Sequence, residues 1–253
     1  MATIQNAYAY WEPGPKEAPV RGLFSVAEVY DTTDAHIGLG AEYQSNRCTQ
    51  SKEWLDFCLP PDVQEWATLA LVQGDSFAVY DGLECDTAAV ADPAEYESRL
   101  QDTFDVKAEA TIEARFQQLL MAEAAIPAPS GALLEMVSVL ETELAANYAG
   151  RGTLHTDRFT SLALYGQNLI EEPHDPDMRV QTINGTPMSL GRGYTRNTGQ
   201  YWAGGAGRVV ILRGPALFTQ TPPLADKPAR FHLQQQVVLL TECVGTWSEV
   251  PTA

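Results

Sequence analysis

The strongest periodic pattern of apolar residues runs for about thirty residues, from Asp92 to about residue 122. Asp92 is a residue type that caps helix N-termini, Pro93 suits the first helical position, and Glu95 follows where a capping-box acid stands. The apolar positions that then recur every three or four residues are Tyr96, Leu100, Phe104, Ala108, Ile112, Phe116 and Leu119 or Leu120. The pattern predicts one helix about 40 Å long, which is more than the width of a small compact domain.

A second helical pattern follows this first one. Pro127 and Pro129 interrupt the first helix, Ser130 is suited to cap the next, and Gly150 and Gly152 end it. The apolar positions that predict this second helix are Leu133, Val137, Leu140, Leu144 and Tyr148.

A third helix is predicted after a short extended connection, residues 153–155. Thr156 or Asp157 is suited to cap it, because a side-chain oxygen at this position accepts from free backbone amides, and an acid there also meets the helix dipole favourably. The apolar side predicted for this helix consists of Phe159, Leu162, Ala163 and Tyr165.

Beyond Pro173 the pattern becomes that of strands. Residues 179–190, RVQTINGTPMSL, predict a hairpin in which Asn184 and Gly185 form a type I′ turn. Residues 200–213 predict a second pair of strands broken by glycines, and residues 231–244 predict a last strand or a helix-to-strand run.

The N-terminal part of the chain has a less regular pattern than the rest. Residues 1–22 contain prolines that prevent a regular element, together with Tyr8, Tyr10 and Trp11, so we expect an arm laid over a neighbouring surface. Residues 23–65 predict an extended excursion or a hairpin. Residues 66–80 predict a strand, a turn and a strand, with the break at Gly74 and Asp75.

These patterns together predict an α+β fold without separable domains. The arm is residues 1–22, the excursion is residues 23–65, and one α+β body spans 66–253, including the long helix at about 92–122. With 253 residues and 45% hydrophobic residues, the chain is long enough to bury a sizeable core. No apolar run reaches the roughly 18 residues that span a bilayer, and no signal-peptide pattern is present, so we expect neither a membrane partner nor secretion by that route.

The formal net charge is −17, which argues against binding of nucleic acid, because affinity for phosphates needs clustered Lys and Arg. The charge is unevenly distributed: residues 1–145 hold 25 acids and 7 bases, whereas residues 146–253 hold 8 acids and 9 bases. An acidic surface of this kind commonly serves solubility. The alternative is complementarity between copies, in which the acidic part of one subunit meets the other part of the next.

The four cysteines show no metal-binding or disulfide pattern. They are Cys48, Cys58, Cys85 and Cys243. They contain no Cys-x-x-Cys pair and no zinc spacing, and without a secretory signal a disulfide framework is not favoured. We therefore expect buried free thiols and no metal or other cofactor.

The one cluster that resembles an active site is His155 with Asp157. A hydrolase would need a nucleophile, and no G-x-S-x-G motif exists; the glycine-rich segments do not match a phosphate-binding loop. His174 and Asp175 lie in an acidic turn between prolines, which is more often a solvated turn than a cation site. We expect His155 to be structural, with its ring between the end of the second helix and the cap of the third.

The order of these elements resembles that of HK97-type major capsid proteins of tailed phages, which encapsulin shells share. The residues carrying the resemblance are the helix that ends in GRGTLH, the hairpin TINGTPM, and the glycine-rich strand WAGGAGRVVILRGP. More narrowly, these segments are similar to coat proteins of actinobacterial phages. The resemblance implies structural roles for the matching positions Gly152, His155, Gly185, Thr186, Pro187 and Gly193.

An HK97-like capsid fold would have an N-terminal arm, a long spine helix, an excursion like an E-loop, and a mixed helix and sheet body whose A-domain-like part is residues 130–215. The implied function is a structural, non-enzymatic subunit that self-assembles into hexamers and pentamers of an icosahedral phage head. It would be found in the virion, and in the host cytoplasm during assembly, with other virion proteins as further partners. The alternatives are a minor virion protein for head completion or decoration, and a cytosolic enzyme using His155 and Asp157.

Overall fold

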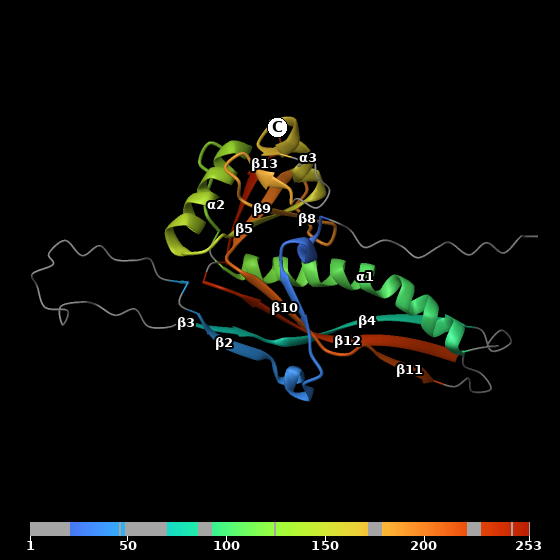
Figure 1. The fold of residues 1–253 in the computed structure, drawn as a ribbon. Helices are drawn as coiled ribbons and strands as arrows, with labels where there is room; N and C mark the ends of the chain where they lie inside the picture. The colour runs from blue at the N-terminus through green and yellow to red at the C-terminus, as the bar shows by residue number, and fades with distance from the viewer. Residues whose placement is uncertain are drawn as a thin grey trace, which may run out of the picture.

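The computed structural model describes residues 21–45, 47–48, 70–85, 93–123, 125–171, 179–221, 229–243 and 245–252. A long helix, α1 (Pro93–Ala122), lies between an extended sheet on one side and a lobe of shorter elements on the other (Figure 1). Nearly all of the predicted arm and Asp92, the proposed helix cap, lie outside the described residues. None of the described helices is both long and apolar enough to cross a membrane.

The long helix forms as its periodic pattern predicts. Pro93 is its first residue, and the apolar stripe from Leu100 to Phe116 is buried. Leu120 continues the stripe, whereas Leu119 is 39% exposed. The prediction of a helix over about 92–122 is confirmed.

The extended sheet lies under α1. Its strand order is β1, β10, β12, β11, and β4 pairs with β12 as well. β1 is parallel to β10, and all other pairs are antiparallel. The strands are β1 (Glu28–Asp31), β4 (Ser76–Cys85), β10 (Val209–Arg213), β11 (Leu217–Thr221) and β12 (Ala229–Thr241).

A two-stranded ribbon lies against one end of this sheet (Figure 1). It consists of β2 (Ala41–Ser45) and β3 (Ala70–Gly74), paired antiparallel, and the short 3₁₀ helix η2 (Ala35–Leu39) precedes it. A cluster of buried side chains joins the ribbon and η2 to the sheet face opposite α1: Ile37, Val72, Val210, Val238 and Leu240. The predicted break at Gly74 and Asp75 is present, but it is not a hairpin turn, because β3 pairs with β2 and β4 pairs with β12.

The lobe on the other side of α1 is built on a second sheet, ordered β13, β9, β5, β8. Helices α2 (Leu133–Asn147) and α3 (Arg158–Gly166) flank this sheet (Figure 1). Its strands are β5 (Thr153–Asp157), β8 (Met188–Gly191), β9 (Gln200–Ala206) and β13 (Gly245–Pro251), and the short pair β6 (Ile170–Glu171) and β7 (Gln181–Thr182) lies beside them.

Two large cores hold these layers together. One lies around α1 and includes Phe116 of the helix, Phe231 of the extended sheet and Trp202 of β9, so α1 is packed from both sides. The other fills the lobe between α2 and its sheet, with Met136, Leu140 and other apolar residues. Burial on both sides explains why so long a helix is stable.

Three predictions of local structure are wrong. Ser130 does not cap α2: the N-cap is Ala132, without a side-chain hydrogen bond. The strands of residues 200–213 do not pair with each other, because β9 belongs to the lobe and β10 to the extended sheet. The apolar side predicted for α3 is largely exposed, and the helix instead buries Thr160, Ser161 and Leu164.

Candidate functional site

The most distinctive site in the molecule is a row of buried polar side chains on α1. Glu109, Glu113 and Gln117 follow one another every four residues, so they lie along one face of the helix. All three are buried, and Glu113 is 0% exposed. We call this row the clasp, because each member bonds backbone groups of a segment distant in sequence.

Two of the clasp residues hold the segment that follows the predicted arm. Glu113 Oε1 accepts from the Leu23 N–H at 2.8 Å, and Glu109 Oε1 accepts from the Phe24 N–H at 3.3 Å. The Leu190 N–H donates to the Arg21 carbonyl at 2.7 Å, which ties the same segment to β8. Residues 21–24 are therefore fixed between the helix and the lobe.

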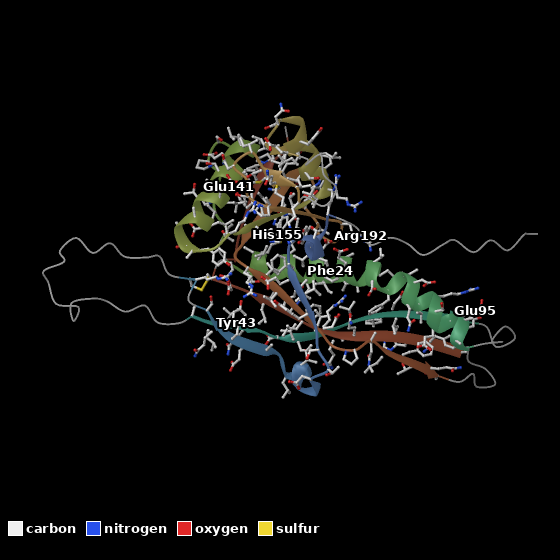
Figure 2. The ribbon with its side chains drawn as sticks, in the orientation of Figure 1. Phe24, Tyr43, Glu95, Glu141, His155 and Arg192 are labelled. Atoms are coloured by element: carbon white, nitrogen blue, oxygen red, sulfur yellow. A yellow bond between two sulfur atoms is a disulfide. The ribbon has the colours of Figure 1, made fainter. Side chains whose placement is uncertain are left out.

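The clasp also holds the loop after β8. Glu113 Oε2 accepts from the Gly193 N–H at 2.7 Å, while Gln117 Oε1 accepts from the Thr195 N–H at 2.8 Å and Gln117 Nε2 donates to the Thr195 carbonyl. Glu113 thus bridges two segments 170 positions apart. Figure 2 shows Phe24 and Arg192, one from each segment, over the same stretch of α1.

Glycines allow these segments to approach the helix closely. A Cβ at Gly193 would stand 1.9 Å from the carbonyl oxygen of Ala110, which is helix backbone. A Cβ at Gly22 would stand 2.4 Å from Glu109 Oε1. Any side chain at Gly193 would have to move the loop away from α1. Gly193 is one of the positions that carry the resemblance to HK97-type capsid proteins, and this close approach explains why a glycine stands there.

The pKa values of both clasp carboxyls, Glu109 and Glu113, are raised. Burial, followed by the neighbouring charge of Glu113, raises the pKa of Glu109 to about 7, against opposing effects of the Phe24 N–H, Arg192 and Arg158. Burial also raises the pKa of Glu113, although the N–H groups of Gly193, Leu23 and Arg192 oppose the shift. Two adjacent buried carboxyls are most stable when one holds a proton.

His155 lies beside the clasp, under the lobe (Figure 2). It is 0% exposed, its Nδ1 is 3.1 Å from the Tyr194 hydroxyl, and the edge of Phe116 meets its ring at a centroid distance of 4.8 Å. Burial lowers the pKa of His155 to about 3, so the ring is neutral at physiological pH. It packs between α1 and the loop after β8; the predicted bridge between the ends of α2 and α3 is not what the structure shows.

Replacement of His155 by Leu is expected to change the free energy of unfolding by no more than about 1 kcal/mol. The variant loses one hydrogen bond to Tyr194, worth about 0.5–1.5 kcal/mol, but it also removes Nε2, which has no partner among the described residues. Tyr194 keeps Ser189 as a partner at 3.3 Å. His155→Asn leaves a gap beside Phe116 and is expected to cost about 2–3 kcal/mol. Thermal unfolding of both variants tests this order; a larger loss for Leu than for Asn would contradict the packing role.

Asp157, one of the two predicted candidates, is the N-cap of α3. Its Oδ1 accepts from the N–H groups of Phe159 and Thr160 at 2.8 and 3.1 Å. Arg196 Nε is 3.9 Å away. Asp157 and His155 bond different groups, and no hydrogen bond joins them. The arrangement therefore gives no acid and base pair acting on a common substrate.

The remaining predicted site residues build the hairpin after β7. Gly185 has φ +85° and its N–H donates to the Thr182 carbonyl at 2.8 Å, while the Thr182 N–H donates to the Thr186 carbonyl at 2.9 Å. Asn184 does not have positive φ, so the predicted type I′ turn is wrong; the loop is a three-residue turn closed by glycine. Asn184 Nδ2 donates to Glu141 of α2, and the Pro187 carbonyl accepts from Leu154 of β5.

Gly152 occupies a crowded position at the start of β5. A Cβ there would stand 2.9 Å from a Leu144 methyl and 3.1 Å from the Ala206 carbonyl oxygen. The glycine lets the chain pass between α2 and β9.

A disulfide between Cys48 and Cys243 contradicts the expectation of free thiols for these two residues. Cys48 lies just after β2, Cys243 lies between β12 and β13, and their Cα atoms are 4.9 Å apart despite 195 residues of separation. Sequence spacing gives no sign of such a pair, because only the fold brings the two turns together. The disulfide fixes the base of the ribbon to the body.

A cluster of charged side chains around the buried Glu242 supports the same junction. Glu242 is almost fully buried, and it accepts from the Tyr148 hydroxyl at 2.9 Å. Arg47 and Arg208 each place a guanidinium nitrogen 3.9 Å from its carboxylate, and Arg208 Nε also bonds Glu28 at 2.8 Å. These contacts join α2, the ribbon and the end of the extended sheet at which β1 and β10 begin and β12 ends. In the described part of the chain, no group of three or more His, Cys, Asp or Glu side chains could hold a metal ion.

Comparison with known proteins identifies the fold. No family model and no curated protein matches the sequence. Among solved structures, the capsid of the native GTA particle matches with a TM-score of 0.61 and 12% identity, covering 98% of this chain and 96% of that one. A structure of Mycobacterium phage Adephagia matches with a TM-score of 0.56 and 12% identity, covering 98% of this chain and 94% of that one. The capsid of Ralstonia phage GP4 matches with a TM-score of 0.56 and 8% identity, covering 100% of this chain and 98% of that one. The chain has a phage capsid fold.

This capsid fold is the α+β, HK97-like architecture that the sequence resembles. The coverage is nearly complete in both directions, so the match includes the long helix, the extended sheet and the lobe together. The clasp residues and the disulfide were not predicted from the sequence. Glu109 and Glu113 look like ordinary members of a solvated helix face, because their spacing carries no sign that a second layer covers them.

Proposed function

We propose that the chain is the major shell subunit of a tailed bacteriophage, which self-assembles into an icosahedral head made of hexamers and pentamers. The observation that supports this most is the capsid fold over almost the whole chain, with no large part of either protein left unmatched. The two alternatives, a minor virion protein and a cytosolic enzyme, have no comparable support.

The extended shape agrees with a subunit whose stable surroundings are other subunits. Large apolar side chains are exposed on η2, the ribbon and the extended sheet, such as Leu39, Leu71 and Tyr80. We infer that the division into arm (1–22), excursion (23–65) and body (66–253), with an A-domain-like part at about 130–215, corresponds to surfaces that meet neighbouring copies.

A structural role also fits His155 and Asp157, the two residues that resembled an active site in the sequence. His155 is enclosed between α1 and the loop after β8, where no substrate reaches it, and Asp157 is occupied as a helix cap. We expect the protein in the virion, and in the host cytoplasm while shells form, with other virion proteins as further partners and without sequence-specific binding of nucleic acid.

Expression of the full chain alone tests the proposal. Purified protein is expected to sediment as large particles, and negative-stain images are expected to show closed round shells. A single ring of fixed size would favour a head-completion protein, and a dispersed subunit under all salt and concentration conditions would contradict self-assembly.

A further inference from the structure

The disulfide between Cys48 and Cys243 is accessible from solvent. Cys243 is exposed and Cys48 is half-buried. The bond lies at the base of the ribbon (Figure 2), and both cysteines line an open groove of about 1110 Å³, together with β3 and the C-terminal part of α1. Small thiols and disulfides can enter such a groove. Accessible disulfides are the ones that exchange readily with them, whereas buried disulfides resist exchange.

The proposed function takes the chain through two redox environments. A subunit that is made and assembled in the host cytoplasm meets glutathione and thioredoxin, which keep accessible thiols reduced. A released virion meets oxidising surroundings, in which disulfides form and persist. An accessible cysteine pair in such a chain is therefore a dithiol during assembly and a disulfide afterwards.

Contacts around the pair hold the two cysteines together without the bond. The Ala149 N–H donates to the Arg47 carbonyl at 2.8 Å, and the Arg47 guanidinium lies 3.9 Å from the Glu242 carboxylate. Arg47 and Glu242 directly precede Cys48 and Cys243 in the sequence. The buried apolar cluster that joins the ribbon to the sheet adds to these contacts. The reduced subunit therefore keeps both thiols close together, and their oxidation needs no refolding.

We propose that Cys48 and Cys243 form a thiol–disulfide exchange site, which is reduced during assembly and locks the ribbon to the body after the shell has left the cytoplasm. The inference rests on the proposed function and adds a covalent step to it. The oxidant is a small disulfide such as oxidised glutathione. One cysteine thiolate attacks it and displaces one glutathione thiolate, and the second cysteine thiolate then attacks the mixed disulfide and displaces the other. The protein loses two protons and two electrons, and the oxidant gains them and becomes two thiols.

The closed bond is expected to stabilise the subunit. It joins residues 195 positions apart, and the restriction that a disulfide places on the unfolded chain increases with the length of the closed loop. It also ties the base of the ribbon to the turn between β12 and β13, which only non-covalent contacts otherwise do. We expect oxidation to raise the thermal midpoint by at least about 5 °C.

Alkylation and mass spectrometry of the full chain test the site. Wild type is expressed in a reducing bacterial cytoplasm, and one half of the cells is lysed in iodoacetamide, which traps free thiols. We expect Cys48 and Cys243 to be alkylated in this half. Particles purified from the other half are incubated with oxidised glutathione. We expect the two cysteine peptides then to be joined by a disulfide, the midpoint to rise, and dithiothreitol to reverse both changes.

Two variants serve as controls. Cys48→Ser removes the pair without altering Cys243, whose φ of +65° makes its turn sensitive to substitution. This variant is expected to assemble with wild-type yield, and its midpoint is expected not to respond to oxidised glutathione. Cys85→Ser removes a cysteine at the other end of the extended sheet, where β4 pairs with the start of β12. The midpoint of this second variant is expected to rise on oxidation as in wild type.

The outcomes separate this inference from the proposed function. The exchange site would be overturned by a pair already joined in cells lysed in iodoacetamide, by no joined peptides after oxidation, or by a midpoint that does not rise. An equal rise in Cys48→Ser would overturn it too, as would a loss of particles in that variant alone, because the bond would then be needed for assembly. Failure of the wild type to form any particle would overturn the proposed function instead, and the same peptides and midpoints of dispersed subunits then decide the exchange site.

Discussion

Gly193→Ala is expected to lower the free energy of unfolding by about 3 kcal/mol, the upper end of the cost of overpacking. A Cβ at this position would stand 1.9 Å from the Ala110 carbonyl oxygen and 2.7 Å from the carbonyl carbon, both in the backbone of α1. The loop must therefore move away from the helix, which also lengthens the hydrogen bond between the Gly193 N–H and Glu113. For a chain of this size the loss corresponds to a fall in the thermal midpoint of roughly 6–12 °C.

The matched control is Gly166→Ala. Gly166 ends α3, a Cβ there meets nothing within 4 Å, and its φ is not in the left-handed region. Since Ala favours helix more than Gly, this variant is expected to be as stable as wild type or slightly more stable. Equal midpoints for the two glycine variants would show that the loop does not rest on α1 as closely as the structure places it.

Glu109→Gln is expected to stabilise the protein at pH 8 by roughly 2–3 kcal/mol and to leave it unchanged at pH 4. The pKa of Glu109 is about 7 in the folded chain, above the ordinary glutamate value of 4.5, because the group is buried beside Glu113. The folded state therefore binds this proton more tightly than the unfolded state. The associated stability is fully present below pH 4.5 and is lost as the pH rises to about 7.

Chemical denaturation of wild type and variant from pH 4 to pH 8 measures this difference. Asp102→Asn is the control, since it removes one carboxylate from the exposed side of the same helix. A difference between Glu109→Gln and wild type that does not grow with pH, or an equal growth in the Asp102 variant, would contradict a buried, protonated clasp.

The helices were predictable because each has a strong local signal. The stripe from Leu100 to Phe116, the proline at position 93 and the cap at Asp157 are all properties of adjacent residues. Strands were also predicted within residues 66–80 and 200–213, where β3, most of β4, β9 and β10 lie. Local patterns cannot name a strand's partner, however, so the pairing of β9 with β13 and of β10 with β12 was missed.

The clasp and the disulfide were unpredictable for a related reason. A glutamate at position 113 has the spacing of a solvated face, and only the return of residues 21–24 and 191–195 onto α1 buries it. Cys48 and Cys243 meet only after the extended sheet has formed. The prediction for α3 was wrong for a different reason: the apolar residues Phe159, Leu162 and Tyr165 were recognised, but the helix packs through Thr160, Ser161 and Leu164 and leaves them exposed.

A cryo-EM reconstruction of particles formed by the full chain tests the central claim most directly. The account predicts a closed shell with five-fold vertices, in which every subunit position holds this chain. A particle in which this chain occupies only one ring, or a preparation that contains only dispersed subunits, would contradict its assignment as the major shell subunit.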